Sequence, residues 1–266
     1  MEFRSPRRWT LLLAGWLASG CALYGWSQEG HRIAARVAQE ELSERSRQRM
    51  AYLVGKDVSL QDVSTWADEI VQERPETEAW HSITIPPGAR GIDFRRDCPL
   101  GDCITVKMRD CIGIVRLGIQ SREQILDAFR MLVSLVADMH HPMLNGYPPS
   151  HANDHRIVDL DGVEMSLFDL WESGLIDHLG SEEEVLERVR KAVASEEART
   201  WTAGTYRSWT WETHLIARDH IYPAVSDGPG KTVLRGTALD KASKILVDQL
   251  AKSAVRLAYV LDVIWP

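Results

Sequence analysis

Apolar side chains recur every three or four residues along most of this chain, which is the periodicity of an α-helix buried on one face. The clearest segment begins at Ser121 and runs to Met139, shortly before Pro142, a residue that cannot continue a helix. Further helices are predicted over residues 30–53, 59–73, 166–178, 181–195, 210–221 and 238–264. With 44% hydrophobic residues and no internal repeat, the 266 residues predict a single all-α domain with one core.

Two intervals interrupt this pattern. Residues 82–112 contain Pro-Pro-Gly at 86–88, three cysteines and the short β-prone run Ile104–Met108, so we expect a long loop with at most a small β-hairpin. Residues 143–162 predict a second, polar loop. Long loops on a helical scaffold often carry functional side chains.

The first 25 residues differ from the rest of the chain. Arg4, Arg7 and Arg8 precede a charge-free apolar stretch from Trp9 to Tyr24. A basic segment followed by a short apolar one is typical of a secretory signal peptide. We therefore expect a signal peptide over 1–25 and a mature domain over 26–266.

Two alternatives to cleavage remain open. The apolar stretch is an uncleaved membrane anchor in the first, although sixteen strongly apolar residues are short for a bilayer span. In the second, Cys21 carries a lipid, although the preceding residues fit such a site only loosely. The favoured interpretation is a secreted or periplasmic monomer without stable membrane association.

Net charge limits how the protein can bind nucleic acid. The whole chain has a charge of −7, and residues 1–25 contribute three arginines and one glutamate, so removing this net +2 leaves −9. An acidic protein gains no long-range attraction for phosphate from its own side chains. A bound metal or a local basic patch would have to supply the positive charge.

The cysteines favour an oxidising compartment. Cys98 and Cys103 enclose a short loop and are a candidate disulfide, with Cys111 left over. A zinc knuckle is the alternative, but it would need two further ligands at suitable spacing.

Four short motifs combine histidine, aspartate and tryptophan. They contain Trp26 and His31, then Asp68, then His81, and finally Asp138, which interrupts the apolar face of a long predicted helix. For each residue taken alone, the simplest interpretation is an ordinary packed or exposed histidine at His31 and His81, and an ordinary solvated carboxylate at Asp68. Asp138 is different, because an ionised carboxylate among apolar neighbours needs a salt-bridge partner or a metal.

Taken in order, these motifs resemble those of the class I zinc-dependent nucleases, the S-one/P-one type. Members of that family begin the mature chain with Trp, have His five residues later, and continue with Trp-Ala-Asp and Trp-His. A helix reading His-x-x-x-Asp-x-His-Gln-Pro-Leu-His follows, then Asn-Leu-His-x-x-Trp-Asp-Ser-Gly-Leu. The matching positions here are Trp26, His31, Asp68, His81, Asp138, His140, Pro142 and the segment Ser166–Leu175. Outside these motifs, the loop Cys98–Cys103 and the segments Ala217–Pro223 and Gln249–Ala258 also match.

The resemblance implies an all-α domain of the phospholipase C/P-one nuclease type and a zinc-dependent endonuclease or phosphodiesterase. Such enzymes hydrolyse single-stranded DNA and RNA, and often act as 3′-nucleotidases. One zinc would take the mature amino terminus of Trp26, His31 and a share of Asp138. A second would take Asp68, His81 and Asp138, with Asp68 also orienting the catalytic water.

The family's remaining zinc ligands are replaced in this chain. A histidine of the second site is Ser134 here, and the two histidines and the aspartate of the third site are Leu144, Phe168 and Glu172. Serine is a weak zinc ligand, and leucine and phenylalanine cannot bind zinc. The resemblance therefore implies one or two zinc ions and loss of the third site.

Three other histidines are open candidates. His141 shares a helix face with Ser134 and Asp138 and could replace the missing ligand. His151 and His155 lie in the loop where the family's Gly-Gly-Asn is replaced by Ala-Asn-Asp at 152–154.

Two functions compete with a working nuclease. A catalytically degenerate relative would bind a ligand or partner without hydrolysis, because four of nine expected ligands are replaced. A zinc phospholipase C would share the N-terminal Trp ligand, although the Trp-Ala-Asp and cysteine-loop motifs favour the nuclease branch.

Overall fold

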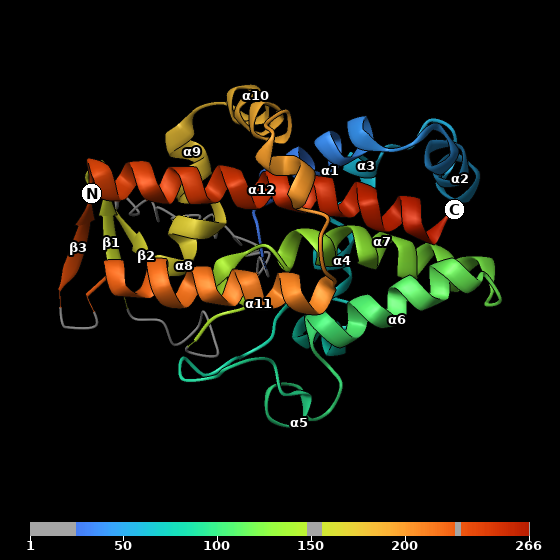
Figure 1. The fold of residues 1–266 in the computed structure, drawn as a ribbon, viewed down its shortest axis with the longest axis horizontal. Helices are drawn as coiled ribbons and strands as arrows, with labels where there is room; N and C mark the ends of the chain where they lie inside the picture. Colours follow the sequence, from blue (N-terminus) through green and yellow to red (C-terminus); the bar gives the residue numbers. More distant parts are fainter. Residues whose placement is uncertain (1–24, 148–155, 227–229, 266) are drawn as a thin grey trace, which may run out of the picture.

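The computed structural model describes residues 25–147, 156–226 and 230–265, and these residues form one mainly helical domain (Figure 1). The longer helices are α1 (Gln28–Glu41), α2 (Glu44–Val54), α6 (Ile104–Leu117), α7 (Arg122–Asp138), α10 (Glu182–Val193), α11 (Tyr206–Ile216) and α12 (Thr237–Ile264). The short helices are α3 (Leu60–Val63), α4 (Trp66–Ile70), α5 (Phe94–Asp97), α8 (Leu167–Asp169) and α9 (Leu175–Leu179). Within the described ranges, no helix is long and apolar enough to cross a bilayer.

Tighter and wider helical turns connect these elements. The 3-10 segments are η1 (Pro75–His81), η2 (Pro142–Leu144), η5 (Glu197–Thr200) and η7 (Tyr222–Ala224). The π-helical segments are η4 (Leu170–Gly174) and η6 (Ala217–Ile221). Because η4 continues directly from α8 into α9, the predicted helix over 166–178 is present with a widened turn inside it.

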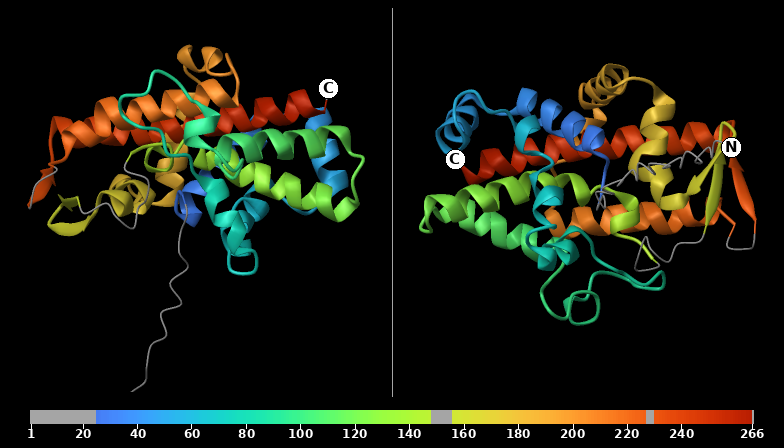
Figure 2. Two further views of the ribbon diagram at one scale, coloured as in Figure 1. Left: turned by 90° about the horizontal axis from the view of Figure 1, so that it is seen from below. Right: turned by 180° about the vertical axis from the view of Figure 1, so that it is seen from behind.

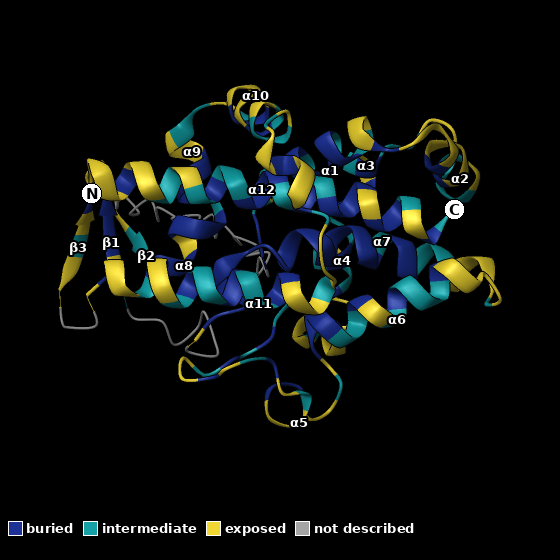
Figure 3. Ribbon diagram, viewed as in Figure 1, coloured by how far each residue is buried: buried dark blue, intermediate teal, exposed yellow. Residues whose placement is uncertain are grey.

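Helices α7 and α12 form the centre of the core. Helix α12 runs along the length of the molecule, and α1, α7 and α10 pack against it (Figures 1 and 2). Helix α7 starts at the capping residue Ser121, whose side chain accepts from the backbone N–H of Gln124, and its C-terminal half is buried throughout (Figure 3). The predicted helices over 121–139 and 238–264 are thus confirmed, and α7 carries Asp138 into the interior.

A small sheet lies at the end of the molecule opposite the α6–α7 turn (Figure 2). Its strands are β1 (Ile157–Leu160), β2 (Val163–Ser166) and β3 (Lys231–Leu234), in the order β2-β1-β3. Strand β1 pairs antiparallel with β2 and parallel with β3. The all-α class is confirmed, with a third strand beyond the hairpin that the sequence predicted.

The expected position of that hairpin was wrong. Residues 104–108 begin helix α6 instead, directly after the N-cap Cys103. The buried side chains of α6 include Ile104, Met108, Cys111 and Val115, which recur at helical spacing and cover the core. Burial of this face decides the local structure more strongly than the β-propensity of a five-residue run.

Two predicted helices are each divided into two. The segment 30–53 breaks at Ser43, which caps α2 and also donates from its hydroxyl to Asp262 Oδ1 at 2.7 Å. The segment 59–73 begins as predicted at Ser59, in a capping box with Asp62, but turns before Trp66 to start α4. This turn changes the direction of the chain just before Asp68.

The disulfide prediction is confirmed. Cys98 and Cys103 are bonded, which excludes a zinc knuckle formed by these two thiols. Cys111 is a free, buried thiol, and burial raises its pKa to about 12. Cys111 therefore stays protonated and unreactive at neutral pH.

Candidate metal centre

Four separate elements bring their ionisable side chains to one buried point. His31 lies in the first turns of α1, Asp68 in α4, His81 at the end of η1 and Asp138 at the last residue of α7. His31, His81 and Asp138 are each at most 1% exposed. Residues separated by more than one hundred positions in sequence thus converge in the core.

Asp138 lies between the two imidazoles. Its Oδ1 is 3.2 Å from His31 Nε2, and its Oδ2 is 2.8 Å from His81 Nδ1. Asp68 lies farther from the same two rings, at 3.6 Å from His31 Nε2 and 3.6 Å from His81 Nδ1. Each carboxylate therefore bridges the two histidines, with Asp138 making the closer contacts.

The donor set fits a metal ion. His31, Asp68 and Asp138 each offer one ligand atom, and these atoms lie within 4.8 Å of one another. Both ring nitrogens of His31, both carboxylate oxygens of Asp68 and Oδ1 of Asp138 are buried without a hydrogen bond to the described residues. Unsatisfied buried polar atoms are costly, and imidazole nitrogen and carboxylate oxygen are zinc ligands.

The pKa of each histidine and aspartate in this group depends on burial and on the charges of the others. Burial alone would lower the pKa of His31, but the carboxylates of Asp138 and Asp68 outweigh it and raise the pKa to about 8. Burial alone would raise the pKa of Asp138, but His31 and His81 hold it below its usual range. For Asp68, burial is the largest effect and raises its pKa. Asp138 is thus the permanent anion of the group.

Trp26 is fully buried beside this group. Its indole Nε1 donates to the carbonyl of Ala137 at 3.0 Å, one residue before Asp138. Its ring also meets that of His141 edge-on, with 4.6 Å between centroids. At Gly25, an added Cβ would lie 1.8 Å from Asp138 Oδ1, so the backbone just before Trp26 packs closely against the carboxylate.

Ser134, at which the resemblance placed a histidine of the second site, has a structural role. Ser134 is buried, and its hydroxyl donates to the backbone carbonyl of Ser64 at 3.0 Å. This bond ties α7 to the turn that precedes Asp68. His141, the candidate substitute, packs its ring between Trp26 and Phe168, and it is not among the clustered ligand atoms of His31, Asp68 and Asp138.

The three positions at which the resemblance placed the third site, Leu144, Phe168 and Glu172, are all buried, and two of them are apolar. Leu144 is 2% exposed and Phe168 is 6% exposed, and the Phe168 ring lies 5.6 Å from that of His141. Glu172 is 8% exposed, and burial, followed by the charges of Asp169 and Asp68, raises its pKa to about 7. Its backbone carbonyl accepts from Ser27 N at 3.0 Å, which anchors the start of α1. His151, His155 and residues 152–154 lie outside the described residues.

A buried network that the sequence did not indicate holds the chain just after Asp138. His140 Nε2 is 2.9 Å from Arg256 NH1, and Gln249 Nε2 donates to the His140 carbonyl at 2.9 Å. Burial and the nearby Arg256 cation hold the pKa of His140 well below its usual range. No local motif could reveal this pairing, because α12 contacts α7 only after folding. The signals present in the sequence were the family matches at His140 and over Gln249–Ala258, and the position of Arg256 on the apolar face of the predicted C-terminal helix.

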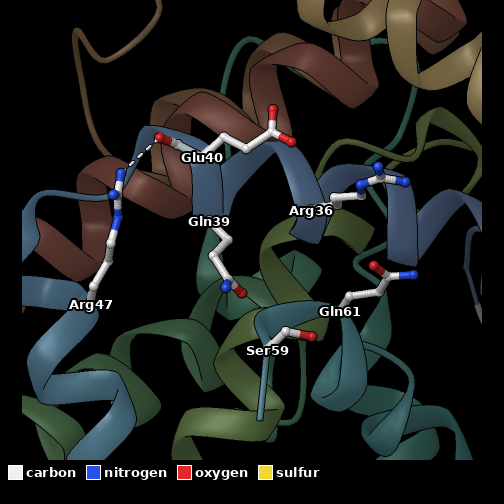
Figure 4. A pocket seen from close by; sticks show the side chains of 6 residues that line it. All are labelled: Arg36, Gln39, Glu40, Arg47, Ser59 and Gln61. Carbon is white, nitrogen blue, oxygen red and sulfur yellow. Dashed lines mark hydrogen bonds between the residues drawn. The ribbon is translucent and has the colours of Figure 1, made fainter. Parts of the chain in front are cut away.

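A polar groove of about 560 Å³ lies apart from this centre, between α1, α2 and α3 (Figure 4). Its lining residues are Arg36, Gln39, Glu40, Arg47, Ser59 and Gln61. Arg36 pairs with Glu183, and Glu40 pairs with Arg190, so two of its charges are already neutralised. None of the candidate metal ligands lines this groove.

Known proteins match this chain over nearly the whole described domain. The family model S1/P1 Nuclease matches residues 26–265. Nuclease S1 of Aspergillus oryzae is 24% identical over 276 residues, covering 94% of this chain and 96% of its own. Endonuclease 2 of Arabidopsis thaliana is 23% identical over 288 residues, covering 95% of both chains. Nuclease P1 of Penicillium citrinum is 25% identical over 155 residues, covering 56% of this chain and 57% of its own. From the match across the domain, the chain belongs to the S1/P1 nuclease family.

Proposed function

We propose that this protein is an exported, zinc-dependent nuclease that hydrolyses phosphodiester bonds in single-stranded DNA or RNA. The observation that supports it most is the convergence of His31, Asp68, His81 and Asp138, in which His31 and Asp68 have buried ligand atoms without a hydrogen bond to the described residues. Family membership supplies the reaction class. The disulfide between Cys98 and Cys103 supports export to an oxidising compartment.

The candidate residues would have two roles, holding zinc and orienting the attacking water. His31, Asp138 and the amino group of Trp26 would hold one zinc, and Asp68, His81 and Asp138 would hold another. Bound zinc lowers the pKa of water and stabilises negative charge on a phosphate. Asp68 would accept a hydrogen bond from the attacking water and orient it. Asp138 remains ionised and balances the positive charge.

The amino terminus gives the sharpest test. Two purified forms would be compared, one beginning at Trp26 and one retaining Gly25, each with its first residue confirmed by mass spectrometry. A free α-amine binds zinc, whereas the amide nitrogen of a continued chain does not. We expect zinc bound per chain, and chelator-sensitive cleavage of a single-stranded oligonucleotide, to be highest for the form beginning at Trp26.

Two controls make this result specific. A choline-phospholipid substrate should remain intact, which separates a nuclease from a zinc phospholipase C. Full zinc occupancy without any cleavage of single-stranded DNA, RNA or a 3′-nucleotide would refute the proposed activity.

A second candidate function is a non-hydrolytic binding module. The apolar packing of Leu144 and Phe168 favours it, because these side chains cannot hold the third zinc of the family. It predicts substoichiometric zinc and a melting temperature that chelator barely changes. Robust turnover that chelator abolishes would exclude it.

A further inference from the structure

We propose that Arg256 is a positioning residue for the metal centre, acting through His140 on the turn of chain that follows Asp138. The proposal rests on zinc binding at the proposed site, but it does not depend on catalysis. It is carried by a set of buried hydrogen bonds between α12, α11 and the C-terminal end of α7.

The orientation of the His140 ring follows from its two partners. Its Nδ1 is 2.7 Å from the carbonyl of Val136, which can only accept, so Nδ1 carries the proton. Its Nε2 is 2.9 Å from Arg256 NH1, which can only donate, so Nε2 accepts. Both ring nitrogens are therefore satisfied, and the ring ties the last turn of α7 to α12.

Arg256 is itself held rigidly. It is 3% exposed, its Nε donates to the carbonyl of Trp201 at 2.8 Å, and its NH2 donates to Glu212 Oε2 at 2.5 Å. Its guanidinium also lies over the ring of Trp209, 5.0 Å from the centroid. A buried guanidinium with partners on several sides makes a fixed donor.

The backbone after Asp138 is held by further bonds. A helix ends with carbonyls that lack intrahelical partners, and α7 ends at Asp138. Gln249, also on α12, donates to the carbonyl of His140 at 2.9 Å. Asn145 Nδ2 donates to the carbonyls of Met139 and His141, each at 3.0 Å. Asn145 Nδ2 also donates to the Asp138 carbonyl at 3.3 Å, so side chains bond four successive carbonyls, residues 138–141, and restrict rotation of this turn.

Position matters at Asp138 because its two oxygens serve two different histidines, at 3.2 and 2.8 Å. Metal sites tolerate errors of only about 0.5 Å in ligand placement. A rotation of the last turn of α7 would improve one contact and lose the other. Arg256 therefore fixes the orientation of the Asp138 carboxylate through His140, without contacting the candidate metal ligands itself.

The test measures metal binding by the mature protein beginning at Trp26. Zinc affinity is measured by competition with a chelating dye, and the visible spectrum of the cobalt(II)-substituted protein reports coordination geometry. Arg256→Met should weaken zinc binding about tenfold, the lower end of the cost of losing an outer-shell partner, and shift the cobalt bands. Arg256→Lys, which retains one donor, should recover part of the loss.

A double variant guards against simple unfolding. His140→Leu with Arg256→Met replaces both partners by apolar groups, an exchange that folded proteins often tolerate. The matched control is Lys252→Met, one turn earlier on α12, which removes an ion pair to the same Glu212 but no contact with His140. The control should leave zinc affinity and the cobalt spectrum unchanged.

The outcomes separate this proposal from the proposed function. A folded double variant with unaltered zinc affinity and cobalt spectrum would overturn the role of Arg256 and leave the zinc site intact. An equal loss in the Lys252→Met control would show a general stability effect and would also overturn it. Failure of the unsubstituted protein to bind zinc would overturn both.

Discussion

Two neighbouring regions around Asp138 have opposite character. On one side, ring nitrogens of His31 and His81 lie 3.2 and 2.8 Å from the Asp138 carboxylate, and the Asp68 carboxylate lies 3.6 Å from each of these nitrogens. On the other side, Leu144 and Phe168 fill the positions where the family has histidines. We refer to these as the ligand side and the apolar side of the centre.

The two sides differ in what they offer an ion, which is nitrogen and oxygen atoms on one side and apolar side chains on the other. Burying a leucine or phenylalanine side chain contributes roughly 1.5–3 kcal/mol, so Leu144 and Phe168 stabilise the core on the apolar side. On the ligand side, both ring nitrogens of His31 and both carboxylate oxygens of Asp68 are buried without a hydrogen bond to the described residues, so an ion bound there would satisfy them. Retention of such a costly group favours a binding role on that side.

The largest expected effect comes from removing the shared carboxylate of the ligand side. Asp138→Asn should weaken zinc binding by more than about 100-fold, because it changes an anion that both histidines contact. Zinc affinity of the mature protein measures this. Asp161→Asn is a matched control, since Asp161 accepts from His178 Nδ1 at 2.7 Å near the surface, away from the centre. Equal losses in the two variants would contradict the ligand side as the metal site.

The second effect is a pH dependence specific to the ligand side. Protonated His31 cannot bind zinc, and its carboxylate neighbours raise its pKa to about 8. Protonation of His31 should therefore lower zinc affinity by about tenfold for each pH unit below 8, or about 100-fold by pH 6, in addition to the effect of protonating the Trp26 amine, and should matter little above pH 8. Competition titrations from pH 6 to 9 would show this slope. A flat profile below pH 8 would mean that His31 is not a ligand.

A third prediction concerns adding metal ligands to the apolar side. Combining Leu144→His, Phe168→His and Glu172→Asp restores the family's residues at the third-site positions. We expect up to one additional zinc per chain by elemental analysis, at some cost in stability because two buried apolar side chains are lost. Leu144→His alone is the control and should add no zinc. Unchanged metal content in a folded triple variant would show that more than ligand identity separates the two sides.

The smallest effect concerns the one carboxyl group of the apolar side. The pKa of Glu172 is raised to about 7, so the native state favours the protonated form and loses stability as pH rises from about 5 through 7. Glu172→Gln lacks this loss and should be more stable than the parent at pH 8 by about 1–2 kcal/mol. At pH 5 the two should differ little. Chemical denaturation of the metal-free protein at both pH values measures the difference.

Sequence reasoning succeeded where local rules decide the structure. Ser121 and Pro142 bound α7 because a capping hydroxyl and a missing N–H act within a few residues. It failed at Ile104–Met108, where a β-prone run lies on the buried face of a helix. It also missed the division of residues 59–73, because the turn before Trp66 depends on contacts between α4 and α7.

The candidate site divides in the same way. His31, Asp68, His81 and Asp138 were identifiable from ordered motifs, and the structure brings these four together. The bond from Ser134 to Ser64 and that from Arg256 to His140 were not predictable, because each joins segments that meet only in the tertiary fold. Sequence motifs identify the candidate metal ligands, whereas the hydrogen bonds that position those ligands come from residues far away in the sequence.

The close approach of Gly25 to Asp138 makes one position a reporter of processing. A Cβ added at residue 25 would lie 1.8 Å from Asp138 Oδ1, so a chain that keeps this residue favours glycine there, because any other residue must displace the carboxylate. A chain cut before Trp26 has discarded the residue and with it the restriction. Saturation mutagenesis of codon 25 would therefore distinguish a trimmed protein from an intact one by tolerance alone, without sequencing a single amino terminus.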